Sequence, residues 1–171
     1  MSNAPTFLPA GDLFTLGAEA IVNPVNCVGK MGKGLALTFK NMYPENFRAY
    51  AAICARRELK PGGLFPYKHP SRPDPWILNV ATKNHWRDHS NLDDVQACAQ
   101  ALVDFCRKNS IRTVACPALG AGNGRLPWDT VRAVLELALV SEHTEFTVFL
   151  PQGPTPADTA RARRTGFGHR K

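Results

Sequence analysis

Twice along this chain, an apolar strand pattern leads into a glycine-rich turn, and a helical pattern begins directly after the turn. The first strand pattern covers Ala20–Val25 and the second covers residues 113–118. Apolar residues on both faces are typical of central strands in a sheet that is covered on two sides. Because such strands alternate with helices, we expect an α/β fold, a three-layer α/β/α sandwich with a parallel or mixed central sheet, and we predict the mixed form.

The other elements follow from residue spacing and from turn residues. Short apolar or β-branched runs predict further strands at residues 6–9, 64–67, 76–81 and 146–150. Helical spacing predicts helices that begin at Gly34, at Pro44 with Tyr50 on its apolar stripe, after a Ser90 and Asp93 capping pair, and at Pro127.

Composition limits the class of protein. With 171 residues, 44% of them hydrophobic, the chain is long enough for one domain with a full core. No apolar run approaches the roughly 20 residues that span a bilayer. The five cysteines are scattered, without a Cys-x-x-Cys pair, which indicates free thiols in a reducing compartment. We expect a cytoplasmic monomer without membrane contact.

Positive charge is concentrated at the end of the chain. The formal net charge is +7, and the segment after Gly153 holds five basic residues and one acidic residue. We expect one domain over residues 1–152 and a disordered basic tail over 153–171, which either contacts nucleic acid or only solubilises the chain. His85 and His89 have the spacing of some zinc ligands but lack a third partner, so we expect no metal and no cofactor.

The turn after the first strand has the features of a phosphate and ribose cradle. Asn23 and Asn26 mark the strand's end, and three glycines and two lysines follow in residues 27–34. Glycine lets backbone N–H groups approach an anion, a helix start adds unpaired amides, and asparagine can hydrogen-bond sugar hydroxyls. A Walker A loop is excluded because no Ser or Thr follows Gly-Lys. Taken alone, an ordinary strand-to-helix turn explains this segment equally well.

The second turn, at residues 119–124, changes that balance. Two cradles at the carboxyl ends of strands can face each other across the edge of a sheet and hold both phosphates of a diphosphate. This turn is a poor match to the GxGxxG of dinucleotide folds and comes late in the chain. A nucleotide sugar is therefore the expected ligand.

The order of these patterns resembles the macrodomain signature. The matching residues are Gly11-Asp12-Leu13, Ile21-Val22-Asn23 with Asn26, Gly32-Lys33-Gly34, and Pro117 to Gly124, within about residues 6–151. Macrodomains bind ADP-ribose, so the resemblance implies that both glycine loops contact the diphosphate.

The resemblance also implies a role for particular residues. Asp12 would lie at the adenine, and Asn23 and Asn26 would surround the distal ribose. Phe149 or Pro151 would line the adenine pocket. The substrate-binding residues implied in this way are Asp12, Leu13, Asn23, Asn26, Met31, Gly32, Gly34, Leu35, Thr82, Leu119, Gly120, Ala121, Gly122, Asn123, Gly124, Phe149 and Pro151.

Within the family, the chain resembles the branch that contains terminal ADP-ribose protein glycohydrolase and the DarG antitoxins. Met31-Gly32-Lys33-Gly34 and Ala81-Thr82-Lys83 resemble the whole branch, and Asn84-His85-Trp86-Arg87 resembles DarG. The resemblance implies that Lys83 is catalytic. Terminal glycohydrolase has a catalytic aspartate where this chain has Gly124, and DarG-type enzymes also lack that aspartate. This departure puts a paired lysine and aspartate mechanism in doubt.

Three chemical roles are open to Lys83. A neutral amine can attack a ring-opened sugar aldehyde to form a Schiff base, or it can take a proton from water. A cation can instead stabilise the leaving base or hold a phosphate. The first two roles require a pKa lowered from about 10.4 by burial or by a neighbouring positive charge. Without the resemblance, a solvated loop lysine is the simpler interpretation.

The residues beside Lys83 indicate a nucleic-acid acceptor. His85, Trp86 and Arg87 interleave aromatic and basic groups, which suits base stacking and phosphate pairing in single-stranded DNA. Packing of Trp86 against the domain explains the same pattern. The DarG resemblance favours DNA and implies removal of ADP-ribose from thymidine that a DarT-type toxin has modified. The alternatives are hydrolysis of ADP-ribosyl-glutamate on proteins, and a reader that binds ADP-ribose without cleaving it.

Overall fold

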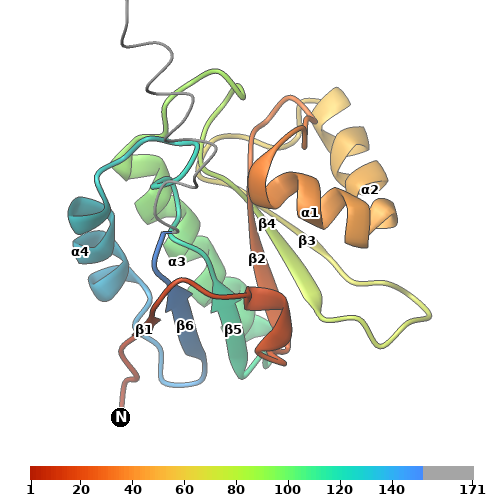
Figure 1. The fold of residues 1–171 in the computed structure, drawn as a ribbon. Helices are drawn as coiled ribbons and strands as arrows, with labels where there is room; N and C mark the ends of the chain where they lie inside the picture. Colours follow the sequence, from red (N-terminus) through yellow and green to blue (C-terminus); the bar gives the residue numbers. More distant parts are fainter. Residues whose placement is uncertain (152–171) are drawn as a thin grey trace, which may run out of the picture.

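The computed structural model describes residues 1–151, which form one sheet flanked by helices (Figure 1). The strands are β1 (Thr6–Leu8), β2 (Ala20–Val25), β3 (Leu64–Tyr67), β4 (Trp76–Ala81), β5 (Thr113–Cys116) and β6 (Glu145–Phe149). The helices are the 3-10 helix η1 (Leu13–Thr15) and the α-helices α1 (Gly34–Met42), α2 (Pro44–Ala55), α3 (Leu92–Lys108) and α4 (Trp128–Ala138). All the expected strands and helices are present, with ends that differ by one or two residues.

The sheet is mixed, as predicted. Its strand order is β1-β6-β5-β2-β4-β3, and each neighbouring pair is parallel except the antiparallel edge pair of β3 and β4. β2 lies between β5 and β4, and its last residue, Val25, is level with Ala81 at the end of β4. The loops that follow β2 and β4 therefore start side by side.

Helices cover both faces of the sheet, which confirms the three-layer sandwich. Ala20 and Val22 of β2 face a core formed with α3 and α4. Ile21 points to the opposite face, where it packs with η1 and α1, and Val25 packs with α2 on that side. This alternation buries β2 on both faces, because the side chains of a strand point alternately to its two sides.

One local prediction is wrong. The N-terminal cap of α3 is Asn91, whose Oδ1 accepts the N–H of Asp94 at 2.8 Å, rather than a Ser90 and Asp93 pair. Ser90 instead lies one residue before the cap, buried, and its hydroxyl has no hydrogen-bond partner within residues 1–151. The loop after β5 packs against this hydroxyl.

The loops after β2, β4 and β5 gather at the carboxyl edge of the sheet, at the top of Figure 1. All five cysteines are buried and unpaired. Within residues 1–151, no helix is both long enough and apolar enough to cross a membrane. The predicted basic tail lies outside the described residues, so it stays a prediction.

Candidate functional site

The first loop, residues 26–33, is held open by Asn26. Its Oδ1 accepts the N–H groups of Val28 at 3.1 Å and Lys30 at 3.3 Å, and its Nδ2 donates to the Lys30 carbonyl at 2.8 Å. The hydroxyl of Tyr50, a fully buried residue of α2, lies 2.7 Å from the Asn26 carbonyl oxygen and 2.9 Å from Oδ1. Asn26 therefore shapes the loop, and most of its hydrogen-bonding capacity is used within the protein.

Asn23 lies deeper than expected. It has no exposed surface, and its Nδ2 donates to Oδ1 of Asn79 on the neighbouring strand β4 at 3.0 Å. Asn79 in turn pairs with Asn46 of α2 at 2.8 Å, so three asparagines join β2, β4 and α2. Met31 covers Asn23, with its Sδ 3.9 Å from Nδ2. Asn23 therefore supports the packing under the first loop, while its Oδ1 has no hydrogen-bond partner within residues 1–151, so its contact with a sugar stays a prediction.

The second loop, residues 117–127, is compact because two of its glycines have no room for a side chain. Gly120 has φ +74°, and a Cβ there would lie 3.0 Å from Val95 of α3. A Cβ at Gly124 would lie 2.4 Å from Ser90 Oγ and 2.5 Å from the Gly120 carbonyl oxygen. Gly124 also accepts the Ser90 N–H at 3.0 Å, which fixes the loop to the start of α3. An aspartate cannot occupy position 124 in this packing.

The two loops meet. Gly34 has φ +60°, and a Cβ there would lie 2.9 Å from Nδ2 of Asn123. Asn123 therefore lies directly over the start of α1. Within residues 1–151, the N–H groups of Gly32, Lys33, Gly122 and Asn123 have no hydrogen-bond acceptor. Both loops thus present unpaired amides near one junction, which is the arrangement that binds phosphates.

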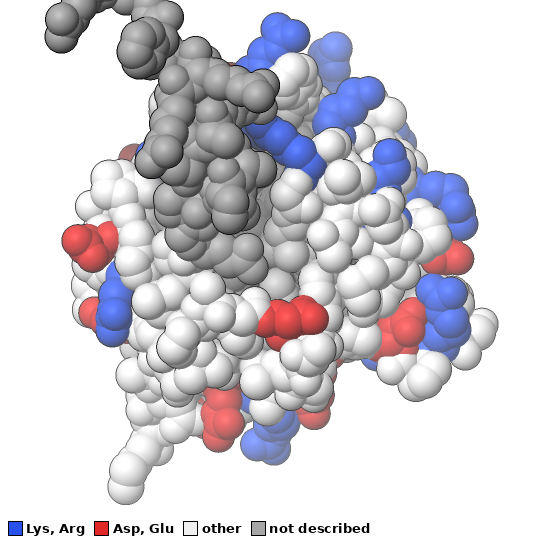
Figure 2. All heavy atoms as spheres, viewed as in Figure 1, with Lys and Arg blue, Asp and Glu red and all other residues white. Residues whose placement is uncertain are grey.

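Lys83 lies at this junction. It follows β4, is half-buried, and donates from Nζ to the carbonyl oxygen of Asn123 at 3.3 Å and of Trp86 at 3.2 Å. Burial lowers the pKa of Lys83 below its ordinary value. The positive charges of Lys33 and Arg125, one from each loop, lower it further, and Asp88 opposes them. Figure 2 shows Lys and Arg atoms gathered at the upper right of the molecule.

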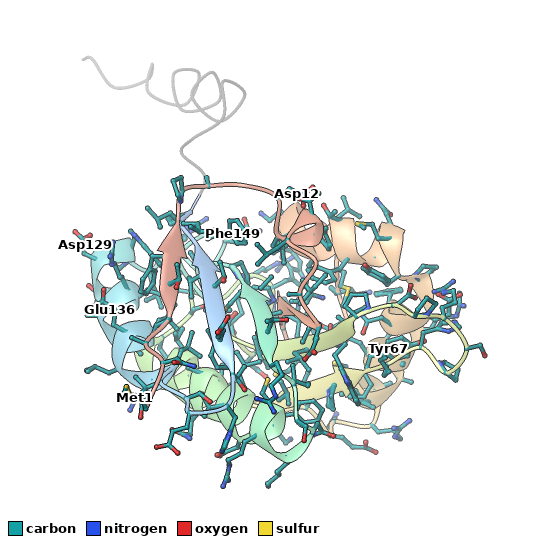
Figure 3. All side chains as sticks on the ribbon, turned by 90° about the horizontal axis from the view of Figure 1, so that it is seen from below. Met1, Asp12, Tyr67, Asp129, Glu136 and Phe149 are labelled. Carbon is teal, nitrogen blue, oxygen red and sulfur yellow. The ribbon has the colours of Figure 1, made fainter. Side chains whose placement is uncertain are left out.

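The opposite end of the expected site combines an exposed carboxylate with an aromatic ring. Asp12 caps η1, with Oδ1 accepting the Phe14 N–H at 2.9 Å, and its side chain is exposed. A Cβ at Gly11 would lie 3.2 Å from the Phe149 ring, so that ring packs directly beside the chain that carries Asp12. Figure 3 shows Asp12 and Phe149 close together at the same edge. Phe149 and Pro151 are half-buried.

The remaining residues that were expected to bind substrate differ in how deeply they are buried. Leu13, Met31, Thr82, Leu119, Gly120 and Gly124 are buried, Leu35 and Ala121 are half-buried, and Gly32, Gly34, Gly122 and Asn123 are exposed. Thr82 donates its N–H to the Val25 carbonyl at 3.1 Å, so it joins the ends of β4 and β2. The buried residues position the loops, and the exposed ones are free to contact a ligand.

The Macro domain family model matches residues 22–135. The chain is a macrodomain. It is 41% identical over 143 residues to a DNA ADP-ribosyl glycohydrolase of Thermus aquaticus, which covers 82% of the chain but only 40% of that relative. The macrodomain of Mycobacterium tuberculosis DarG is 39% identical, with a TM-score of 0.78 over 85% of this chain and 99% of that one. Thermosipho africanus DarTG, solved in complex with ADP-ribose, is 28% identical, with a TM-score of 0.78 over 89% of this chain and 43% of that one.

A hollow in this macrodomain lies away from the loops. It has a volume of about 630 Å³ at the amino-terminal edge of the sheet, and its lining includes Phe14, Tyr43 and Trp76. None of the glycine-loop residues borders it. Its walls carry no glycine loop, so it lacks the amides that a diphosphate requires.

The roles of three supporting residues were not predicted from the sequence. Tyr50 was expected only as part of an apolar stripe, yet its hydroxyl braces Asn26. Asn46 and Asn79 hold Asn23. One signal was available, because Asn79 is the single polar residue in the apolar strand Trp76–Ala81, and a buried polar residue needs a partner.

Proposed function

We propose that this macrodomain binds ADP-ribose across its two glycine loops and removes it from ADP-ribosylated single-stranded DNA, with Lys83 as the catalytic residue. The observation that carries the proposal is the position of the Lys83 amine, hydrogen-bonded to the second loop at the point where it meets the first. The relatives named as DNA ADP-ribosyl glycohydrolases, and the ADP-ribose complex of a structural relative, support it.

ADP-ribose would lie along the line of these features. The adenine fits beside Phe149 and Asp12, where an apolar ring and an exposed carboxylate lie together. The diphosphate fits the unpaired amides of both loops, and the distal ribose then reaches Lys83. Asn26 acts by shaping the first loop, since its amide is already hydrogen-bonded.

Lys83 would work as the neutral amine. Burial and two nearby cations disfavour its charged form, and its pKa falls in the direction that nucleophilic or general-base roles require. As a nucleophile it would attack C1″ of the ring-opened sugar, expel the acceptor with a proton, and form a Schiff base that water hydrolyses to free ADP-ribose. As a base it would take a proton from the attacking water. Reduction with borohydride during turnover traps only the Schiff base.

We propose DNA as the acceptor, and the combination of positive charge with an exposed ring around the site supports this proposal. Trp86 and Arg87 are exposed and His85 is half-buried beside Lys83, and Lys33 and Arg125 add charge from the two loops. Cations pair with phosphates, and a ring can stack on a base. We propose that a DarT-type toxin supplies the modified thymidine on which the chain acts.

A comparison of substrates tests this function. The chain should release free ADP-ribose from an oligonucleotide that carries ADP-ribosylated thymidine, and release it more slowly from ADP-ribosyl-glutamate on a protein. Faster release from the protein would move the acceptor to glutamate. Calorimetric binding of ADP-ribose without release from either substrate would make the chain a reader, a role that needs only the two loops.

A further inference from the structure

The aromatic residue Trp86 is exposed beside the candidate catalytic amine of Lys83. The side chain of Trp86 is 43% exposed, while its own carbonyl oxygen accepts a hydrogen bond from Lys83 Nζ at 3.2 Å. The backbone of this residue therefore contacts the candidate catalytic amine, and the residue remains exposed. With the distal ribose at Lys83, as proposed above, this ring would lie next to the group attached to the sugar.

The segment that carries this ring is fixed in place. Asn84 accepts the N–H of Cys27 in the first loop at 2.8 Å. His85 and Asp88 close a turn around Trp86, because the His85 N–H donates to Asp88 Oδ2 at 3.0 Å and the Asp88 N–H donates to the His85 carbonyl at 3.0 Å. The backbone that carries the ring is thus held in a preformed turn, so little backbone ordering is required when a ligand stacks on the ring.

One face of the ring is occupied by a group that can leave. The Arg87 guanidinium lies over the Trp86 ring, with Cζ 4.5 Å from the ring centroid, and the His85 ring lies 5.2 Å away at 32°. Arg87 is exposed, and an exposed cation–π contact is weaker than the stacking of a base on an aromatic ring. A base can therefore replace the guanidinium, which is then free to pair with a phosphate.

We propose that Trp86 forms a stacking subsite for a nucleobase next to the ADP-ribosylated nucleotide, and that Arg87 moves off the ring to pair with a flanking phosphate. This inference rests on the proposed DNA glycohydrolase function and adds to it a preference for a strand over a single nucleoside. Only a strand supplies both a second base and a bridging phosphate. Trp86 is here a specificity residue and takes no part in bond cleavage.

The test compares release of ADP-ribose from a modified oligonucleotide with release from ADP-ribosylated thymidine nucleoside, as a ratio of the two kcat/KM values. Trp86→Ala should lower that ratio by roughly 5- to 150-fold, the range expected from losing one base stack. Trp86→Phe keeps a ring and should retain most of the ratio. Leu137→Ala removes another exposed apolar side chain, 83% exposed on α4, and should leave the ratio at the wild-type value.

A change in the substrate isolates the stack itself. An oligonucleotide with an abasic residue on each side of the modified thymidine should lower the wild-type rate by the same factor as Trp86→Ala. The same abasic oligonucleotide should cause no further loss in Trp86→Ala, because the ring and the base act only through each other.

Salt dependence tests the role of Arg87. In Arg87→Gln, the plot of log kcat/KM against log salt for the oligonucleotide should be shallower by about 0.7, the slope of one phosphate contact in a single strand. Arg132→Gln is a matched control, because Arg132 makes a similar cation–π contact with Phe7, 4.6 Å from the centroid. Its slope should equal that of the wild type.

Four results would overturn the inference. If Trp86→Ala lowers kcat/KM equally for the oligonucleotide and the nucleoside, the ring is part of the general scaffold. The same conclusion follows if Trp86→Ala lowers kcat/KM equally for the abasic and the normal oligonucleotide. A comparable loss on an ADP-ribosylated glutamate peptide would show that the ring does not read bases. No release from any oligonucleotide by the wild type would defeat the proposed function, and this inference with it.

Discussion

Gly124 offers a sharp test of how the second loop is built. A Cβ at this position would lie 2.4 Å from Ser90 Oγ, 2.5 Å from the Gly120 carbonyl oxygen and 2.9 Å from the Gly120 Cα. Ser90 can rotate away, since its hydroxyl has no partner within residues 1–151. The Gly120 carbonyl cannot move without losing its hydrogen bond from the Leu126 N–H at 2.9 Å. Gly124→Ala therefore overfills a rigid part of the loop.

The expected cost of Gly124→Ala is that of overpacking, about 1–3 kcal/mol in the free energy of unfolding. For a domain of this size, that cost lowers Tm by roughly 2–12 °C. The displaced second loop should also lose its contact with Lys83 and bind ADP-ribose more weakly. Thermal unfolding and calorimetry with ADP-ribose measure the two effects.

Gly122→Ala is the matched control in the same loop. A Cβ there meets nothing within 4 Å. Its Tm should stay within about 2 °C of the wild type, because surface substitutions usually change stability by less than about 0.5 kcal/mol. Equal stability of Gly124→Ala and Gly122→Ala would refute the packing described for this loop.

Three further substitutions test the neighbouring contacts. Tyr50→Phe keeps the ring but removes the hydroxyl that braces Asn26, and should lower the free energy of unfolding by about 1–3 kcal/mol in urea denaturation. Gly34→Ala places a side chain at φ +60° against the second loop and should cost about 1–3 kcal/mol by the same assay, with weaker ADP-ribose binding in calorimetry. Lys33→Gln removes a charge that lowers the pKa of Lys83, so the rise of the rate with pH should move to higher pH; an unmoved profile would contradict the neutral-amine role.

The layers and the two loops could be predicted because local patterns determine them. A strand that is apolar on both faces, such as Ala20–Val25, requires cover on two sides, and the structure provides it. Parallel strands place their following loops at one edge, so two glycine-rich turns after parallel strands had to gather there. The antiparallel pairing of β3 with β4 made the sheet mixed.

The roles of individual polar residues were harder to predict, because they depend on contacts between distant segments. Asn23 lies near the end of β2, but only the register with β4 brings it opposite Asn79 and buries it. Tyr50 reaches Asn26 because α2 packs beneath the first loop, 24 positions away in sequence. Spacing along the chain gives the face of an element, and it does not give the partner across the fold.

The lysine at the loop junction is the centre of this account, and one kinetic measurement tests it most directly. Release of ADP-ribose from a modified thymidine oligonucleotide should fall at least about 100-fold in Lys83→Ala, as expected for loss of a nucleophile or base. Binding of free ADP-ribose should change far less, because the loop amides remain. Lys108→Ala, exposed at the far end of α3, is the control and should keep the wild-type rate. Wild-type turnover in Lys83→Ala would contradict the account.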